Sequence, residues 1–581
     1  MKRTTPLVAL SLLAALALSV SDSRAQSRSA KPAKPSDKGE EQGYFGESVT
    51  VSVVNVDVYV TDKDGKRVTG LNKDDFEVFE NGRPVQITNF YAVEGGNPIR
   101  EEEPAPAPTA EPEPPGAPRE PEKVEVPEEQ KLRLVIYIDN FNLRPFNRNR
   151  VMRELRAFLG SKLKAGDQMM LVSYDRELHI RNTFTSDPSL IAASLLELEK
   201  VTAHAIHYDS DRRDILQRIE DSRSVLEAQS AVRSYAESIY NDLSFSIDAL
   251  KKTVDLLAGL PGRKAILYVS DGLEMMAGQD MFYAVQDKYR EQSSSLTEAF
   301  QFDTSRRFTE LANQANANRI TFYTIDAAGL RVYDSVSAAE RGPGPQAAGL
   351  STLIDSVRIS NLQSPLQMIA EATGGMAVLN SNSVMPHLER IAADFGTYYS
   401  LGYTPPHYGD GRYYKIEVKV KKKGFNVRHR EGYRDKSADS RMTDGTLAAL
   451  SFPFSDNALG VTLEFGKPAA RTDGFYLVPI VVKIPLSKVV LVPRGAQHDA
   501  RLRLFIAAID SSGNTSEVQQ TPVPISVPEA DVDKLDGKHY AYTVSLLMRP
   551  GEQRVAVGVR DDVAAQQAFV SAGLRVGAGS R

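Results

Sequence analysis

Short apolar runs alternate with stretches of helical apolar spacing from residue 131 to about residue 405, and this alternation constrains the fold more than any other feature. The strand-like runs are residues 132–138, 169–174, 265–269, 320–325 and 398–403. Helical patterns lie between them, around residues 149–163, 246–257, 304–315 and 366–372. Repeated strand, helix and strand units favour a mostly parallel sheet with helices on both faces. We therefore predict an α/β domain over residues 131–405.

One stretch of this domain departs from the rhythm because its helical spacing lasts unusually long. From Val232 to Leu257 apolar residues recur every three or four positions, and Ile215, Ile219 and Leu226 precede them at similar spacing. A helix of about 28 residues would be roughly 40 Å long, which exceeds the depth of a sheet layer. We expect a second helix to run back antiparallel, so that a helical hairpin inserted at about 211–245 projects from the domain.

The segment ahead of this domain has the features of a small β domain. Valine alternates with polar residues from Val49 to Val60, and a change of phase near Val53 predicts a half-buried strand with a bulge. Turn signals and further strand-like runs follow, at residues 64–65, 76–79, 81–82 and 85–91. We predict a β domain over residues 47–100.

Two further β segments are predicted after residue 405. Alternation on both sides of Gly424 favours a β-hairpin over residues 406–435. After a polar break, six strand-like runs recur, at residues 447–454, 475–484, 502–509, 523–527, 540–548 and 554–559. With turn signals between them, these runs predict an immunoglobulin-like β-sandwich over residues 445–572 and a tail over residues 573–581.

Three other segments are expected to lie outside the folded domains. Residues 1–25 combine two basic residues, a 14-residue apolar run and a small-x-small site, which is typical of a secretory signal peptide. Residues 26–46 are polar and predict a disordered leader. Residues 101–130 hold nine prolines and ten glutamates, which predict an extended acidic linker. We expect an exported protein, in the periplasm, at the cell surface or outside the cell.

Composition excludes several classes of function. The chain has no cysteine, so disulfides, thiolate metal sites and cysteine nucleophiles are excluded. Its net charge of −5 provides no global positive field for nucleic acid. No stretch after the signal peptide reaches the roughly 18 apolar residues of a membrane span, so we expect no transmembrane segment after signal cleavage. No phosphate loop, nucleophile elbow or paired acid and base appears, and we expect no enzyme activity.

Several motifs of the α/β segment resemble the von Willebrand factor A (vWA) domain. These are Gly166-Asp167 with Leu171-Val172-Ser173-Tyr174, Leu260-Pro261-Gly262-Arg263-Lys264 with Tyr268-Val269-Ser270-Asp271-Gly272, Ala370-Glu371-Ala372-Thr373-Gly374-Gly375, and Tyr398-Tyr399-Ser400-Leu401-Gly402-Tyr403. Together with the flanking β segments, they are similar to the exported "VWFA-related" proteins of Acidobacteria over residues 48 to about 435. The resemblance implies a Rossmann-type sheet and a function in binding another protein, as an adhesion or scaffold component.

The resemblance also implies a metal-ion-dependent adhesion site. Such a site has an Asp-x-Ser-x-Ser loop, a threonine from a second loop and an aspartate from a third, and these oxygens suit Mg²⁺. Asp139 matches the first aspartate, Asp271 the last, and Ser244 the threonine. Phe141 and Leu143 occupy the serine positions and offer no oxygen. The implied site is therefore degenerate.

Two interpretations of these residues remain open. Mg²⁺ on Asp139, Ser244 and Asp271 would bind weakly unless Asn140 or Asn142 turned inward, and helical spacing runs straight through Ser244, where the family has a loop. Alternatively, the two aspartates accept hydrogen bonds from backbone amides or from Arg144. The first interpretation predicts a Mg²⁺-dependent ligand-binding module, and the second a metal-independent binding protein.

Three weaker motifs are also present. His204, His207 and Asp209 could bind a transition metal, although this spacing alone is common. The residues from Asp62 to Gly65 resemble a calcium loop but lack its later glutamate, which favours a hairpin turn. The lysines of residues 419–423 are expected on an exposed strand edge, where they discourage pairing with other chains.

Overall fold

The computed structural model of the protein describes residues 53–95, 97–99, 131–162, 167–203, 205–290, 294–331, 347–454 and 456–577. All of these residues belong to one unit, residues 49–581. The predicted signal peptide, leader and acidic linker lie outside the described residues. None of the described helices is long and apolar enough to cross a membrane.

A six-stranded sheet of order β11-β10-β9-β6-β7-β8 lies at the centre of the α/β domain. Its strands are β6 (Leu132–Asp139), β7 (Gln168–Tyr174), β8 (Leu178–Thr185), β9 (Arg263–Ser270), β10 (Ile320–Asp326) and β11 (Ala377–Val378). Neighbouring strands are parallel except for the edge strand β8, which is antiparallel to β7. Counted within the domain, the order is 3-2-1-4-5-6, the doubly wound arrangement. The predicted mostly parallel α/β sheet is confirmed.

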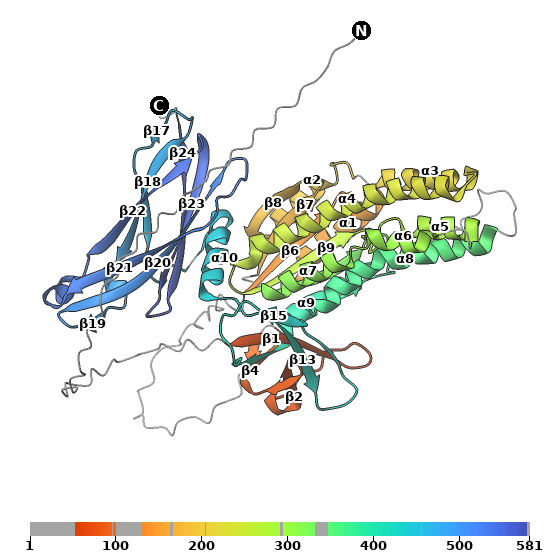
Figure 1. The fold of residues 1–581 in the computed structure, drawn as a ribbon. Helices are drawn as coiled ribbons and strands as arrows, with labels where there is room; N and C mark the ends of the chain where they lie inside the picture. Colours follow the sequence, from red (N-terminus) through yellow and green to blue (C-terminus); the bar gives the residue numbers. More distant parts are fainter. Residues whose placement is uncertain are drawn as a thin grey trace, which may run out of the picture. The chain divides into compact units, whose positions relative to one another are not determined.

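Helices cover both faces of this sheet (Figure 1). Successive side chains of its strands point to opposite faces and pack in two different hydrophobic clusters. Val135 and Tyr137 of β6 pack with α4, α7 and α8, whereas Leu134 and Ile136 pack with α1, α2 and α9. These helices are α1 (Pro145–Lys162), α2 (Pro188–Leu198), α4 (Val225–Ala258), α7 (Ser305–Ala317), α8 (Ala347–Ala372) and α9 (Met385–Gly396). The strand ends are thus held between two apolar layers.

The structure contains the expected helical hairpin, although it does not project alone. α3 (Ile206–Asp221) runs into the 34-residue α4, which is about 50 Å long. α5 (Gln279–Tyr289), followed by the short α6 (Ser295–Ala299), packs against both of them and against α8. Arg212 of α3 also pairs with Asp280 of α5 across 2.8 Å. The hairpin that was predicted to project from the domain is therefore covered by additional helices.

Strand β12 (Tyr398–Tyr403), assigned from the sequence to the α/β sheet, lies in another sheet. It is antiparallel to β1 (Val54–Thr61) on one side and to β4 (Ile87–Glu94) on the other. All six of its residues are buried, so its apolar run has the pattern of a strand in a parallel sheet. Burial pattern alone does not show which strands will be its neighbours, and the boundary at residue 405 is wrong for this sheet.

The small β structure combines residues from both sides of the α/β domain. One sheet has the order β14-β1-β12-β4-β5 and the other the order β15-β13-β2-β3. The remaining strands are β2 (Phe76–Glu80), β3 (Arg83–Val85), β5 (Asn97–Ile99), β13 (Tyr413–Val420), β14 (Asn426–Arg428) and β15 (Gly432–Arg434). β13 and β15 pair antiparallel, so residues 406–435 do pair with themselves as predicted. β13 also pairs with β2, and β14 pairs with β1, so this hairpin is not a separate unit. Residues 54–99 form no sheet of their own.

The C-terminal segment begins with a helix where a strand was predicted. α10 (Ala438–Ser451) starts at Ser437, whose hydroxyl accepts a hydrogen bond from the amide of Ser440. It is buried through Met442, Ala449 and Leu450 against strands of the following domain. The apolar end of this helix resembled a strand because it spans only about two turns. The sandwich therefore starts later than residue 445.

Two antiparallel sheets then share one hydrophobic core. The first contains β16 (Thr462–Phe465), β17 (Ala469–Ala470), β18 (Tyr476–Pro485) and β22 (His539–Met548). The second contains β19 (Val492–Arg494), β20 (Gln497–Asp510), β21 (Gln519–Pro528), β23 (Gly551–Asp561) and β24 (Gln567–Val576). β24 includes the first residues of the predicted tail. The immunoglobulin-like type stays a prediction.

Candidate functional site

Carboxylates follow the ends of three neighbouring parallel strands of the α/β sheet. Asp139 ends β6, Asp271 follows β9 and Asp326 ends β10. Their exposed fractions are only 1%, 4% and 1%. Ligands of doubly wound sheets bind outside the carboxyl ends of the strands, so we call this edge of the sheet the strand-end face.

Asp139 is held by donors from its own loop and from β9. Its carboxylate accepts hydrogen bonds from the backbone amide of Asn142 at 3.1 Å and from the Asn142 side-chain amide at 2.9 Å. The hydroxyl of Tyr268 donates a further hydrogen bond. Burial raises the pKa of Asp139 to about 6, and these donors oppose the shift. Asp139 therefore remains a carboxylate at neutral pH because hydrogen-bond donors of the protein surround it.

Asp271 is held by Arg144, the residue that directly follows the loop of residues 139–143. The backbone amide of Arg144 donates to Asp271 at 2.8 Å and its guanidinium at 3.2 Å. The same guanidinium donates two hydrogen bonds to Asp209 of α3, at 2.9 and 2.6 Å. Asn147 adds a side-chain amide donor at 3.0 Å from Asp271. One cation thus joins the first loop of the sheet, the end of β9 and the helical hairpin.

The charges of this cluster act on one another. Burial raises the pKa of Asp271, while Arg144 counteracts the shift. Burial works in the same direction on Asp209, but the hydrogen bonds from Arg144 are decisive and the pKa of Asp209 is lowered. At neutral pH the cluster is therefore a charged network of arginine and aspartate.

A second guanidinium joins the ends of β9 and β10. Arg331 donates to the carboxylate of Asp326 at 3.0 and 2.8 Å and to the backbone carbonyl of Asp271. Gln363 donates to Asp326 as well, at 2.8 Å. The sequence reasoning missed Asp326 and Arg331. An aspartate at a strand end with an arginine five residues later is the only signal that could have indicated them.

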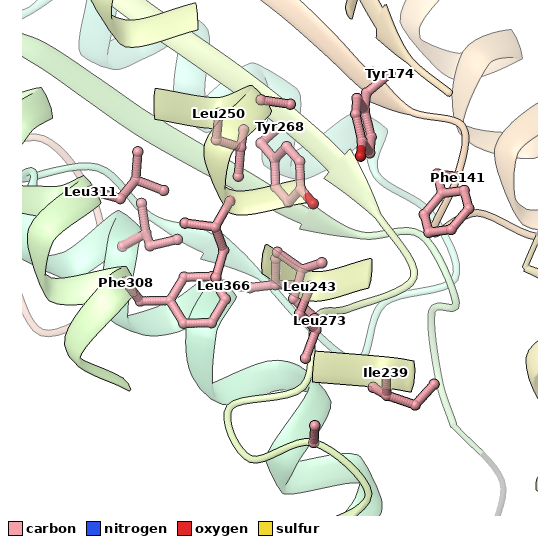
Figure 2. Close-up of a cluster of buried hydrophobic side chains, with 14 of the residues drawn as sticks. Phe141, Tyr174, Ile239, Leu243, Leu250, Tyr268, Leu273, Phe308, Leu311 and Leu366 are labelled. Carbon is pink, nitrogen blue, oxygen red and sulfur yellow. The ribbon is translucent and has the colours of Figure 1, made fainter. Parts of the chain in front are cut away.

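The two residues at the serine positions of the loop are core residues. Phe141 is 1% exposed and packs edge-on against Tyr174, with 6.1 Å between the ring centroids (Figure 2). Leu143 is fully buried in the cluster on the opposite face of the sheet. The loop is therefore anchored by apolar side chains in both layers, where a metal-binding loop would present hydroxyl groups.

Ser244 lies inside continuous helix, as the spacing of apolar residues indicated. Its hydroxyl oxygen is buried and has no hydrogen-bond partner among the described residues. Ser246, two residues later, accepts a hydrogen bond from the Asn142 side chain at 3.1 Å. Within the described part of the chain, no hydrogen bond joins Ser244 to Asp139 or Asp271. A metal ion on these three residues stays a prediction.

The two asparagines of the loop differ in orientation. Asn142 turns toward Asp139 and presents its amide nitrogen as a donor. Asn140 faces elsewhere, since it donates to the carbonyl of Thr202 at 2.7 Å and accepts from Arg148. The strand-end aspartates accept hydrogen bonds from the backbone amides of Asn142 and Arg144, and Asp271 also accepts one from the Arg144 guanidinium.

A cavity of about 60 Å³ lies beside Arg144 and Asp271. Small-molecule sites usually enclose about 300–1,000 Å³, so this space is too small for most substrates. Glu274 lines it and accepts a hydrogen bond from the amide of Gly278 at 2.6 Å. Burial, with a further contribution from Asp280, raises the pKa of Glu274 to about 7.

The weaker motifs have mixed outcomes. Asp62 accepts hydrogen bonds from the amides of Asp64 and Lys66, at 3.0 and 2.8 Å, so this segment is the expected turn. His204 lies outside the described residues, and Asp209 is engaged by Arg144. The lysine run is only partly an edge, because β13 pairs with β2 through Val420.

A separate group of possible metal ligands, which the sequence reasoning missed, lies in the small β structure. It consists of His407, Asp410 and Asp435. Both ring nitrogens of His407 already face carboxylates, Nδ1 at 2.8 Å from Asp435 and Nε2 at 3.1 Å from Glu80. Burial works to lower the pKa of His407, but these carboxylates raise it. The arrangement is that of a histidine held between two acids.

No known family model matches the chain, and no curated protein matches it. Solved structures that match the chain include an aerotolerance-related membrane protein from Bacteroides fragilis, at 10% identity over 45% of this chain and 98% of that one, with a TM-score of 0.20. Manganese-loaded TRAP protein from Plasmodium vivax matches at 10% identity over 52% and 94%, with a TM-score of 0.21. The vWF domain of the pilus tip protein Mfa5 from Porphyromonas gingivalis matches at 12% over 45% and 94%, with a TM-score of 0.20.

The α/β domain has a doubly wound fold with an antiparallel edge strand, which is the type of sheet that the vWA resemblance implies.

Proposed function

We propose that the protein is an exported, non-enzymatic binding protein, an adhesion or scaffold component whose protein partner docks on the strand-end face. The proposal joins the sequence features of export to the geometry of this face. A degenerate metal site lies at its centre, and Arg144 supplies the positive charge there that a metal ion would otherwise provide. The partner is expected to be a protein rather than nucleic acid, since the chain has no excess of positive charge.

The observation that carries this proposal is the exposure of two large apolar side chains that are close in sequence to the arginines that bind Asp271. Phe146 is 79% exposed and Leu330 is 59% exposed. Each lies within two residues of an arginine that binds Asp271, Arg144 to its carboxylate and Arg331 to its carbonyl. Aromatic side chains beside arginines are typical anchors of protein interfaces.

Photo-crosslinking tests the position of the interface. With benzoylphenylalanine in place of Phe146, irradiation in envelope extract is expected to give one discrete crosslinked species, which an added Leu330→Asp change removes. Phe300, which is 68% exposed and lies in the segment after α6, is the matched control position. Absence of a product at position 146, or the same product at both positions, contradicts the proposal.

The alternative is a Mg²⁺-dependent adhesion module, and one observation favours it. The buried hydroxyl of Ser244 has no partner among the described residues, so it is available to a ligand. Thermal melts in EDTA and in millimolar Mg²⁺ or Mn²⁺ separate the two functions. A midpoint that rises with the metal, and no longer does so after Asp271→Ala, supports the alternative. An unchanged midpoint in both proteins contradicts it.

A further inference from the structure

A second cavity, of about 280 Å³, lies at the opposite edge of the α/β sheet from the strand-end face. Lys264 lines it from the start of β9, and Arg319 from the residue just before β10. The connection from α4 to β9 and residues 430–436 complete much of its wall. No part of the proposed protein-binding face contributes to this cavity.

The wall of this cavity carries an excess of positive charge. Its lining contains six basic residues, which are Lys264, Arg319, Arg430, Arg434, Lys436 and Arg441, and only two acidic ones, Asp435 and Asp444. Both acids are already engaged, since Asp435 binds His407 at 2.8 Å and Asp444 binds Lys436 at 2.5 Å. In the part of the chain that the structure describes, the other five cations have no carboxylate partner.

Two of these basic groups, Lys264 in a buried position and Arg430 in a partly buried one, donate their hydrogen bonds to backbone carbonyls. Lys264, which is 6% exposed, donates from Nζ to the carbonyl of Leu260 at 2.6 Å. Arg430 donates to the carbonyls of Asn316 at 3.1 Å and Asn55 at 2.8 Å. Burial lowers the pKa of both groups, and the charge of Arg319 lowers it further. Buried charges without counter-charge are costly, so an anion in the cavity would be stabilised.

Arg319 occupies a backbone conformation that favours glycine. It follows the C-terminal end of α7 with a φ of 55°, in the left-handed region. Helices usually end there with glycine, which adopts this conformation without strain. Arginine at this position therefore places a charged side chain on the cavity wall, although its backbone conformation is less stable than it would be for glycine.

We propose that this cavity is a binding site for a phosphate group, either free or carried on a small molecule. Guanidinium groups match phosphate geometry and remain charged at all physiological pH values. Four guanidinium groups without a carboxylate partner among the described residues, those of Arg319, Arg430, Arg434 and Arg441, suit a dianion better than a single carboxylate. The cavity volume leaves room for a small group esterified to the phosphate.

Binding is tested with the full exported chain in sodium phosphate, in glycerol phosphate and in sodium chloride of equal ionic strength, by thermal melts and by calorimetric titration. We expect phosphate, but not chloride, to raise the midpoint in a saturable way. A stronger response to glycerol phosphate than to inorganic phosphate assigns the site to an ester, and the reverse assigns it to the free ion. A response no different from that of chloride, or an equal response to citrate, overturns the proposal.

Two matched variants locate the effect. Arg319→Gly removes the charge and relieves the backbone conformation, so it is expected to fold normally and to weaken phosphate binding at least tenfold. Arg290, at the C-terminal end of α5, also has a positive φ, of 47°, and does not line the cavity. Arg290→Gly is expected to leave phosphate binding unchanged. Equal affinity in the two variants places phosphate elsewhere and overturns the proposal.

Discussion

At the scale of single residues, Arg144 is the centre of the strand-end face. A metal ion would need several oxygen ligands around it, whereas this loop presents Phe141 and Leu143 to the core. The guanidinium instead carries its charge permanently and binds Asp271 and Asp209 together. Arg144 thus supplies a permanent positive charge at this site.

Arg144→Met is expected to lower the free energy of unfolding by about 1–3 kcal/mol, because it leaves Asp271 with fewer donors in a buried position. The estimate is at the lower end for buried pairs since the side chain of Arg144 is 28% exposed and the amide donors remain. Urea unfolding measures the change. The control is Arg306→Met, which removes an exposed pair with Glu310 and should cost less than about 0.5 kcal/mol. Equal losses in the two variants contradict the role assigned to Arg144.

Glu274→Gln is expected to change how stability depends on pH. The pKa of Glu274 is raised to about 7, so the native state holds a proton that the unfolded chain releases, and stability falls as pH rises from about 4.5 to about 7. The glutamine variant keeps the acceptor for Gly278 and removes the charge. It should exceed the parent protein by about 1–2 kcal/mol at pH 8 and match it near pH 4.5.

Unfolding in urea at several pH values measures this difference. Glu310→Gln is the contrasting variant, because Lys251 lowers the pKa of Glu310 and that carboxylate stabilises the fold at high pH. Its loss of stability should therefore appear at pH 8 and vanish as pH falls. The same sign for both variants would contradict the assignment of Glu274.

At the scale of elements, α4 shows both the strength and the limit of sequence reasoning. The spacing of its apolar residues predicted an uninterrupted helix through Ser244, because one face is buried along its whole length. The same spacing could not indicate that Ser246, rather than Ser244, meets the first loop. That depends on the rotation of the helix about its axis and on the side chain of Asn142.

Ser244→Ala is expected to stabilise the protein by about 0.5–1 kcal/mol, because alanine favours helix and the serine hydroxyl is buried without a partner. Ser246→Ala is the matched variant two residues away and should lower stability by about 1 kcal/mol through the lost hydrogen bond to Asn142. Thermal and urea unfolding in EDTA measure both. A loss on Ser244→Ala that appears only with Mg²⁺ would instead identify Ser244 as a ligand.

The candidate site was predictable only in part. Asp139 and Asp271 follow buried strands of a parallel sheet, so the sequence placed them at one edge. Arg144 appeared as a possible partner because it is near Asp139 in the chain. Asp326, Arg331 and Glu274 were missed, since their contacts depend on how loops of different strands fold over one another.

At the scale of the whole molecule, the small β structure is closed by strands from two distant parts of the chain. β12 lies between β1 and β4, and β13 pairs with β2. Local alternation predicted each of these strands, because burial of one or both faces leaves a pattern in the sequence. Pairing across the α/β domain leaves no local pattern, so the predicted domain at 47–100 and hairpin at 406–435 are two parts of one structure.

A fragment of residues 47–100 is therefore expected to remain unfolded by itself, whereas residues 47–435 should fold. In the short fragment, β1 and β4 lack the strand between them, and the shared core loses Tyr399, Leu401 and Ile416. Dispersion of amide resonances in nuclear magnetic resonance spectra distinguishes the two states. A well-dispersed spectrum from the short fragment would contradict the joint structure.

The position of β12 in the chain delays the completion of the small β structure during synthesis. About 300 residues separate the end of β4 from the start of β12. Because a chain is synthesised at about 5–20 residues per second, β12 is completed on the order of 15–60 s after β1 and β4. During this interval their edges are open templates for pairing with other chains. Yield in a producing cell is therefore expected to depend on which factor covers these edges during synthesis, more than on the stability of the finished fold.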